Sequence, residues 1–169
     1  PSAVGPAAGS VTMRLPIVLG LPIYGRAHLA EGAAEPGPRE RSRLWSTPMT
    51  SVDAWVESTG AGPVSFIKAD VEGFEPQVLE GAAATIDRDR PAVLLEIEDR
   101  HLERYGTVAA EVVAEIRRRD GASNVLLVDA GDTFSDDYVG NATRGEAMIR
   151  LMNALGYHFM ALGNHDFDY

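Results

Sequence analysis

The sequence predicts an α/β fold, with a mainly parallel sheet that carries helices on its faces. After residue 63, segments of strand and helix character alternate without interruption. Two of the predicted strands, 92–97 and 124–129, are nearly continuous apolar runs, which is typical of strands covered on both faces. The helical segments between the strands suit right-handed crossovers, so neighbouring strands are expected to run parallel.

The first third of the chain has a less regular pattern. Residues 1–10 are small and rich in Gly and Pro, and we expect them to be frayed. Residues 11–24 predict one or two short extended segments, which their prolines keep at a sheet edge or in a loop. Residues 32–42 are polar and predict a loop.

From residue 50 onward the pattern becomes regular. The predicted strands are 64–68, 92–97, 124–129 and 158–162. The predicted helices are 52–57, 76–86, 108–116 and 144–155, whose apolar residues recur at helical spacing. Their start and stop signals are Thr50 or Ser51, Pro76 in a first turn, Thr107, a capping box of Thr143 with Glu146, and Gly156.

Composition and charge exclude several classes of protein. The 169 residues contain no cysteine, which removes disulfides, zinc ribbons and thiol nucleophiles. No apolar run approaches the ~20 residues of a membrane helix, so we expect no membrane partner. The net charge is −10, which argues against a nucleic-acid polymer as partner and is compatible with metal binding. The chain starts at Pro1 without a signal peptide, and we expect a piece of a longer protein.

Acidic side chains follow two predicted strands at the edge where such sheets carry their chemistry. Asp70, Glu72 and Glu75 follow the strand at 64–68, and Glu96 lies at the end of the next strand. These carboxylates are suited to bind a metal, orient a substrate or act as a general base. The alternative is that acids before a helix only favour its positive end.

The same residues resemble the signature of FkbM-type methyltransferases. The resemblance covers about residues 11–116 and is carried by TSVD at 50–53, SFIKADVEGFE at 65–75, VLEGA at 78–82 and RPAVLLEI at 90–97. It implies a Rossmann-like three-layer fold, a cytoplasmic location and S-adenosylmethionine-dependent methyl transfer to a hydroxyl of a small molecule or sugar. By position it implies that Asp70 and Glu72 lie near the acceptor and Glu96 at the next strand end, so these three are the catalytic candidates.

The Gly-rich cofactor loop of that family has no counterpart in this sequence. The single Gly-x-Gly, at Gly60 and Gly62, follows a predicted helix and precedes a strand. That order is the reverse of the strand-to-helix turn that cradles a cofactor. We therefore expect no S-adenosylmethionine-binding residues in this chain and no methyl transfer by the chain alone.

The last two predicted strands lead into a different pair of motifs, DAGDTF at 129–134 and GNHDFD at 163–168. Over about residues 113–169 they resemble calcineurin-like metallophosphoesterases of the 5′-nucleotidase branch. The resemblance implies that Asp132 bridges two divalent metals such as Mn²⁺ or Mg²⁺, that Asn164 is a ligand of one, and that His165 stabilises or protonates phosphoryl oxygens. The alternative is that these are turn residues after strands.

This second site is expected to be incomplete. The family's leading Asp-x-His ligands and its later histidines have no counterpart here, and two ligands do not hold a binuclear centre. We expect at most a weak, water-rich divalent site and no hydrolysis of a nucleotide monophosphate.

Three hypotheses follow for the whole chain. The first is a partial methyltransferase over 1–116 fused to a partial phosphoesterase over 117–169, with a small-molecule substrate and no activity alone. The second is a divalent-metal-dependent phosphoesterase acting on nucleotides, with the upstream part as scaffold. The third is a non-catalytic chimeric α/β protein. The sequence makes no prediction of oligomeric state.

Overall fold

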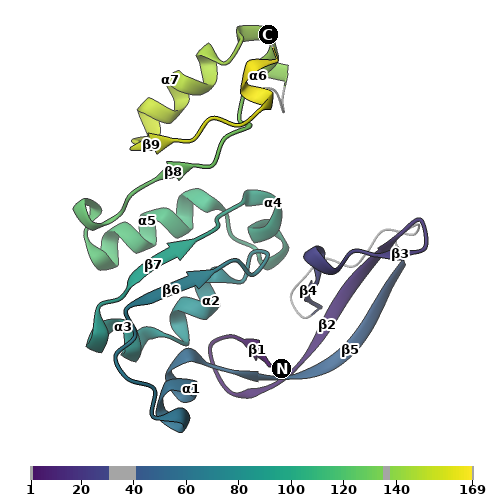
Figure 1. Ribbon diagram of the computed structural model, residues 1–169, viewed down its shortest axis with the longest axis vertical. Coiled ribbons are helices and arrows are strands. Elements are labelled where there is room, and N and C mark those ends of the chain that lie inside the picture. The colour runs from purple at the N-terminus through teal and green to yellow at the C-terminus, as the bar shows by residue number, and fades with distance from the viewer. Residues whose placement is uncertain (1, 31–40, 135–137, 169) are drawn as a thin grey trace. The chain divides into compact units, whose positions relative to one another are not determined.

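A computed structural model describes residues 2–30, 41–134 and 138–168, and Figure 1 shows its elements in chain order. The chain divides into two compact units, Pro1–Val113 and Ala114–Tyr169. The predicted mixture of strands and helices is confirmed. The described strands form three sheets, however, and the largest of them mixes parallel with antiparallel pairs. The single, mainly parallel sheet that the sequence predicts is therefore not what the described residues form.

Two long antiparallel strands form the main part of the first sheet (Figure 1). Strand β2 (Gly9–Val18) pairs with β5 (Arg41–Thr50), from Gly9 opposite Met49 to Ile17 opposite Arg41. The smaller elements beside them are β1 (Ala3–Val4), which is parallel to β5, β3 (Leu21–Pro22) and β4 (His28–Leu29), which are antiparallel to β2, and the 3-10 turn Tyr24–Arg26.

Two expectations for this region are wrong. The start of the chain is not frayed over the described residues 2–10, because these contain β1 and the start of β2. Strand β2 is not at an edge, since β5 lies on one side of it and β3 and β4 on the other. Pro16 fits there because it lies between the residues of β2 that pair with β4 and those that pair with β3. The loop predicted at 32–42 lies outside the described part of the chain over residues 32–40, and its last two residues belong to β5.

The parallel strand pair of the first unit carries the candidate site. Strands β6 (Phe66–Ala69) and β7 (Ala92–Leu95) are in register, with Ala69 opposite Leu95. The strand–helix–strand order predicted here is confirmed. Residues 92–94 are exposed, so the expectation that β7 is covered on both faces is wrong.

The predicted helix at 76–86 is two helices, α2 (Glu75–Glu80) and α3 (Ala83–Asp89). Helix α3 begins where it does because the Asp53 carboxylate accepts the N–H groups of Ala84 at 3.0 Å and Thr85 at 2.8 Å. Asp53 thus acts as a helix cap that is supplied from a distant part of the sequence.

The other helices of the first unit differ in how well their caps are predicted. Ser51 caps α1 (Val52–Thr59), as predicted, because its Oγ accepts the N–H of Ala54 at 3.1 Å. Thr107 does not cap the helix after it. The Oδ1 atom of Asp99 accepts the N–H of Ala109 instead. The elements that follow β7 are α4 (Asp99–Leu102), the 3-10 turn Glu103–Tyr105 and α5 (Ala109–Asp120), and α5 begins in the first unit and ends in the second.

The hydrophobic core of the first unit is formed mainly by α1, β6 and the helices that follow. Its buried apolar side chains include Val56, Ala69, Val78, Leu79, Ala82, Ile86 and Leu102. Burial of these side chains is the main stabilising contribution to the unit.

The second unit has short strands and two helices. Strand β8 (Val128–Asp129) is parallel to β9 (Phe159–Met160). The buried strand predicted at 124–129 is wrong in extent and burial, because the 3-10 turn Ala122–Asn124 precedes β8 and Val128 is exposed. The remaining elements are α6 (Tyr138–Thr143), α7 (Glu146–Leu155) and the 3-10 turn His165–Phe167.

The ends of α7 are partly as predicted. Gly156 ends the helix in the left-handed conformation, at φ 74°, as expected. The predicted capping box is wrong, because Gly145 is the residue before the helix. Thr143 still contributes, since its Oγ1 accepts the N–H of Ala147 at 3.2 Å.

The Asp53 cap leads to a first prediction. We expect Asp53→Ala to lower the free energy of unfolding by about 1–2 kcal/mol at neutral pH, as loss of a helix cap does. Burial alone raises the pKa of Asp53, but hydrogen bonds from Thr85 and Ala84 outweigh it and lower the pKa below 3.8. The stability that ionised Asp53 contributes is therefore fully present above pH 3.8. It is lost as the pH falls through the lowered pKa of Asp53 in the folded protein. Urea unfolding of both proteins across this range checks the prediction, and a difference that is independent of pH would contradict it.

Candidate active site

The exits of β6 and β7 bring two predicted site residues together. Asp70 follows Ala69 at the end of β6, and Glu96 follows Leu95 at the end of β7. Ala69 is opposite Leu95, and the N–H of Glu96 donates to the carbonyl oxygen of Ala69 at 3.1 Å. The parallel ladder thus extends to the point where the two carboxylates leave the sheet.

The charges around this pair change the acidity of Glu96. The negative charge of Asp70 raises the pKa of Glu96, and desolvation and a hydrogen bond with Glu98 add to the effect. Lys68 Nζ lies 3.2 Å from Asp70 Oδ2, so the two side chains form an ion pair beside Glu96. Burial alone raises the pKa of Glu98, but its hydrogen bond and ion pair with Arg100 lower it overall. Glu96 is therefore a stronger proton acceptor than an ordinary glutamate.

Glu72, the third predicted site residue of this unit, contacts a different set of groups. Its Oε2 lies 3.0 Å from His101 Nε2 and 3.5 Å from Arg104 Nη1. Its side chain is only 17% exposed, and its backbone has a φ of 57°. Glu72 therefore ties the loop after β6 to α4 and the turn that follows it.

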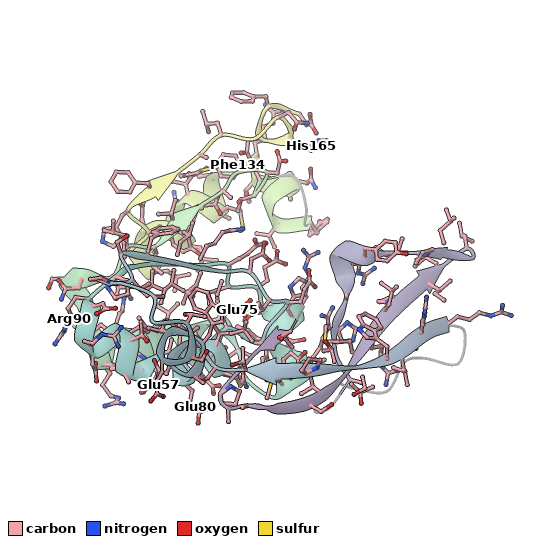
Figure 2. All side chains as sticks on the ribbon, turned by 60° about the horizontal axis from the view of Figure 1, so that its bottom comes forward. Glu57, Glu75, Glu80, Arg90, Phe134 and His165 are labelled. Atoms are coloured by element: carbon pink, nitrogen blue, oxygen red, sulfur yellow. The ribbon has the colours of Figure 1, made fainter. Side chains whose placement is uncertain are left out.

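Glu75 is a buried carboxylate to which sequence reasoning gave no role of its own. It is 2% exposed, and its Oε1 accepts the N–H of Val71 at 2.9 Å and of Gly73 at 3.4 Å (labelled in Figure 2). These bonds fold the loop that carries Glu72. The signal in the sequence was the third acid of DVEGFE, but only the structure separates its function from that of the other two.

The glycine turn at Gly60 does not fit a cofactor cradle. Gly60 ends α1 in the left-handed conformation, and the chain then enters β6. It is a helix-to-strand turn, as predicted, so its N–H groups are not presented at the start of a helix. What this unit presents at the ends of its parallel strands is a pair of carboxylates, Asp70 and Glu96.

In the second unit, the loops after β8 and β9 meet. Asp132 Oδ1 accepts the N–H of His165 at 2.8 Å, and His165 Nδ1 lies 2.8 Å from Asp168 Oδ2. Asn164 directly precedes the 3-10 turn that begins at His165. Burial alone raises the pKa of Asp166, but N–H groups of Gly163, Phe134 and Asp132, among others, lower it overall.

The residues of the second unit do not fit a divalent metal centre. Within residues 2–30, 41–134 and 138–168, no group of three or more His, Asp or Glu side chains could hold an ion. The Oδ1 atom of Asp132, the predicted bridging ligand, accepts the His165 N–H.

Parallel strands with a helical crossover and carboxylates at their exits define an α/β domain of the kind that methyltransferases use. A family model described as the Methyltransferase FkbM domain matches residues 18–159. The chain belongs to this family. The matched range runs across residue 116, and the domain boundary predicted there stays a prediction.

Curated 5′-nucleotidases match a shorter part of the chain. The snake venom 5′-nucleotidase of Gloydius brevicauda is 42% identical over 64 residues, which are 38% of this chain and 11% of that protein. The 5′-nucleotidase of Homo sapiens is 46% identical over 56 residues, 33% of this chain and 9% of that protein. The chain thus spans about a tenth of the length of these relatives.

Both resemblances inferred from the sequence are confirmed by these comparisons. No solved structure matches the chain. In the part of the chain that the structure describes, every helix is too short or too polar to cross a membrane.

Proposed function

We propose that the first unit is the acceptor side of an FkbM-type O-methyltransferase that acts on a hydroxyl of a small molecule or sugar in the cytoplasm. The observation that carries the proposal is the pair of carboxylates at the exits of β6 and β7. The raised pKa of Glu96 makes it a better base than an ordinary glutamate, while Asp70 supplies the charge that raises it. Glu96 then accepts the proton of the acceptor hydroxyl, and Asp70 orients that hydroxyl by accepting a hydrogen bond.

In the complete domain, we infer that β6 and β7 belong to a Rossmann-like, three-layer parallel sheet. Phe66 and Leu94 support this inference, because each is more than half exposed on a parallel strand pair that such a sheet would cover. S-adenosylmethionine is the cofactor that the family implies, and the Gly60 turn does not fit it. The chain alone is therefore proposed to be inactive in methyl transfer.

The charge coupling within the pair gives a direct test. We expect Asp70→Asn to lower the pKa of Glu96 toward its ordinary value of 4.5, because the substitution removes the largest cause of the upward shift. Titration of the Glu96 carboxyl carbon by NMR measures it. Asp87→Asn removes the same charge at an exposed position of α3 and serves as the control. An unchanged Glu96 pKa in Asp70→Asn would remove the basis for a coupled pair.

Inactivity of the chain alone is tested separately. Isothermal titration with S-adenosylmethionine is expected to give no binding heat. Incubation with a methyl-labelled cofactor and hydroxyl acceptors is expected to give no transfer of the labelled methyl group. Measurable turnover by the purified 169-residue chain would overturn this part of the proposal.

A second candidate function comes from the loops after β8 and β9 and from the partial similarity to 5′-nucleotidases. We propose that residues 117–169 correspond to the metal-bearing N-terminal part of such a phosphoesterase, fused to the methyltransferase part and inactive on nucleotides. Asp132, Asn164 and His165 are the residues with proposed roles at the phosphate. Metal-dependent hydrolysis of a nucleotide monophosphate that is lost in Asp132→Ala would instead support a working phosphoesterase. If neither S-adenosylmethionine nor Mn²⁺ binds, the non-catalytic chimera is favoured.

A further inference from the structure

The loops after β8 and β9 are in direct backbone contact. A Cβ atom on Gly131 would lie 2.5 Å from the nitrogen of Gly163, and a Cβ on Gly163 would lie 2.0 Å from Asp132 Oδ1. Such distances are shorter than real Cβ contacts, so glycine is needed on both loops. The closeness of the loops allows the side chain of one to bond the backbone of the other.

Asp166, on the second loop, reaches across to the first. Its Oδ2 accepts the N–H of Asp132 at 3.0 Å, and its Oδ1 accepts the N–H of Phe134 at 3.1 Å. It also closes its own loop, since Oδ2 accepts the N–H of Gly163 at 2.9 Å. The residue is only 8% exposed, so these bonds are shielded from water. Figure 2 labels Phe134 and His165, which lie on the two loops.

Asp132 makes the reciprocal contact from the first loop. Its Oδ1 accepts the N–H of His165 at 2.8 Å, while its backbone has a φ of 59° and follows Gly131 at 97°. A left-handed backbone at a residue other than glycine is strained. The bonds to Asp166 and His165 offset that strain, and they fix where the Asp132 carboxylate lies.

We propose that Asp132 and Asp166 form a carboxylate brace, which holds the two loops together and positions Asp132 and His165 without a metal ion. The brace consists of these two carboxylates and the four N–H groups that they accept, from Asp132, Phe134, Gly163 and His165. Asp166 is a positioning residue, since it acts on the site through the backbone of the others. This role deepens the second candidate function and rests on it, whereas the brace itself is a property of the metal-free protein.

Amide hydrogen exchange of the full chain, measured by NMR in the presence of EDTA, tests the brace. We expect the amides of Asp132, Phe134, Gly163 and His165 to be protected without metal. In Asp166→Asn, one oxygen becomes an NH₂ group that repels an N–H donor. Exchange should then accelerate by about tenfold or more at the amides that lose their acceptor, which are Phe134 for Oδ1 or Asp132 and Gly163 for Oδ2, as loss of a hydrogen bond to a charged group implies.

The reciprocal variant separates positioning from general stability. Asp132→Asn should accelerate exchange chiefly at His165. In both variants the amides of His158 and Ala161, which bond to Leu127 and Asp129 in the ladder, should stay protected. Glu146→Gln, which removes an exposed charge on α7, is the matched control and should change none of these amides.

Two results would overturn the proposal. One is protection of the four amides that develops only after Mn²⁺ is added, because a metal would then hold the loops. The other is unchanged exchange at Asp132, Phe134 and Gly163 in Asp166→Asn. If Asp166→Asn unfolds the unit, the Asp132→Asn variant decides. Loss of exchange protection that is confined to the His165 amide supports the brace, and unchanged protection there overturns the proposal. Neither readout depends on hydrolysis, so a failure of the brace is distinct from a failure of the proposed phosphoesterase role.

Discussion

Gly73→Ala is expected to remove most of the stability of the first unit, with a loss of about 3 kcal/mol or more in the free energy of unfolding. Gly73 has a φ of 101°, and an added Cβ would lie 2.4 Å from the carbonyl oxygen of His101 and 2.5 Å from its carbon. Those atoms are backbone of α4, so no side-chain rotation relieves the clash. The loop after β6 would have to move away from α4.

Gly60→Ala is the matched control for this prediction. Gly60 also has a positive φ, 63°, but nothing lies within 4 Å of the position of its Cβ. Its substitution should therefore cost only the conformational strain, about 1 kcal/mol. Urea unfolding followed by tryptophan fluorescence measures both variants, because the two tryptophans of the sequence, Trp45 and Trp55, belong to the first unit. Equal losses of unfolding free energy in the two variants would show that the clash with α4 does not contribute to the effect of Gly73→Ala.

Leu102→Ala is expected to have the second large effect, about 2–5 kcal/mol lost from the free energy of unfolding. Leu102 is 0% exposed and ends α4, so its truncation leaves a cavity in the core of the first unit. Leu94→Ala removes the same atoms from an exposed position on β7 and should cost much less. The same fluorescence-detected unfolding applies. A loss below 1 kcal/mol in Leu102→Ala would mean that the core collapses around the missing side chain.

Features of the fold that depend on local chemistry could be predicted from the sequence. Ser51 caps α1 with its own hydroxyl, and Gly156 ends α7 because a left-handed residue is needed there. The crossover from β6 to β7 follows from the order of apolar and amphipathic segments.

Features that depend on distant partners could not be predicted. Strand β5 has no strict alternation, and its length is set by pairing with β2 more than twenty residues upstream. The break between α2 and α3 depends on Asp53, and the start of α5 on Asp99. No local signal in the sequence identifies either carboxylate as a cap for a helix so far along the chain.

In the candidate site, too, some features could be predicted from the sequence, and those that depend on distant partners could not. The rule that parallel strands end at one edge predicted that Asp70 and Glu96 would lie close together. It did not separate Glu72 from them, because the side chains that Glu72 contacts, His101 and Arg104, belong to a later helix and turn. Asp166 was part of a recognised motif, but its N–H donors lie on the other loop as well as on its own.

Lys68 offers a practical consequence, since it is the single lysine of the sequence and stands 3.2 Å from Asp70. A reagent that acylates lysine side chains has one place to attach in this sequence, at the end of β6 beside the carboxylate pair. A fluorophore or fluorine tag coupled there would report local binding without any engineered cysteine. A protease that cleaves after lysine would likewise cut the chain at one position, between Lys68 and Ala69 within β6.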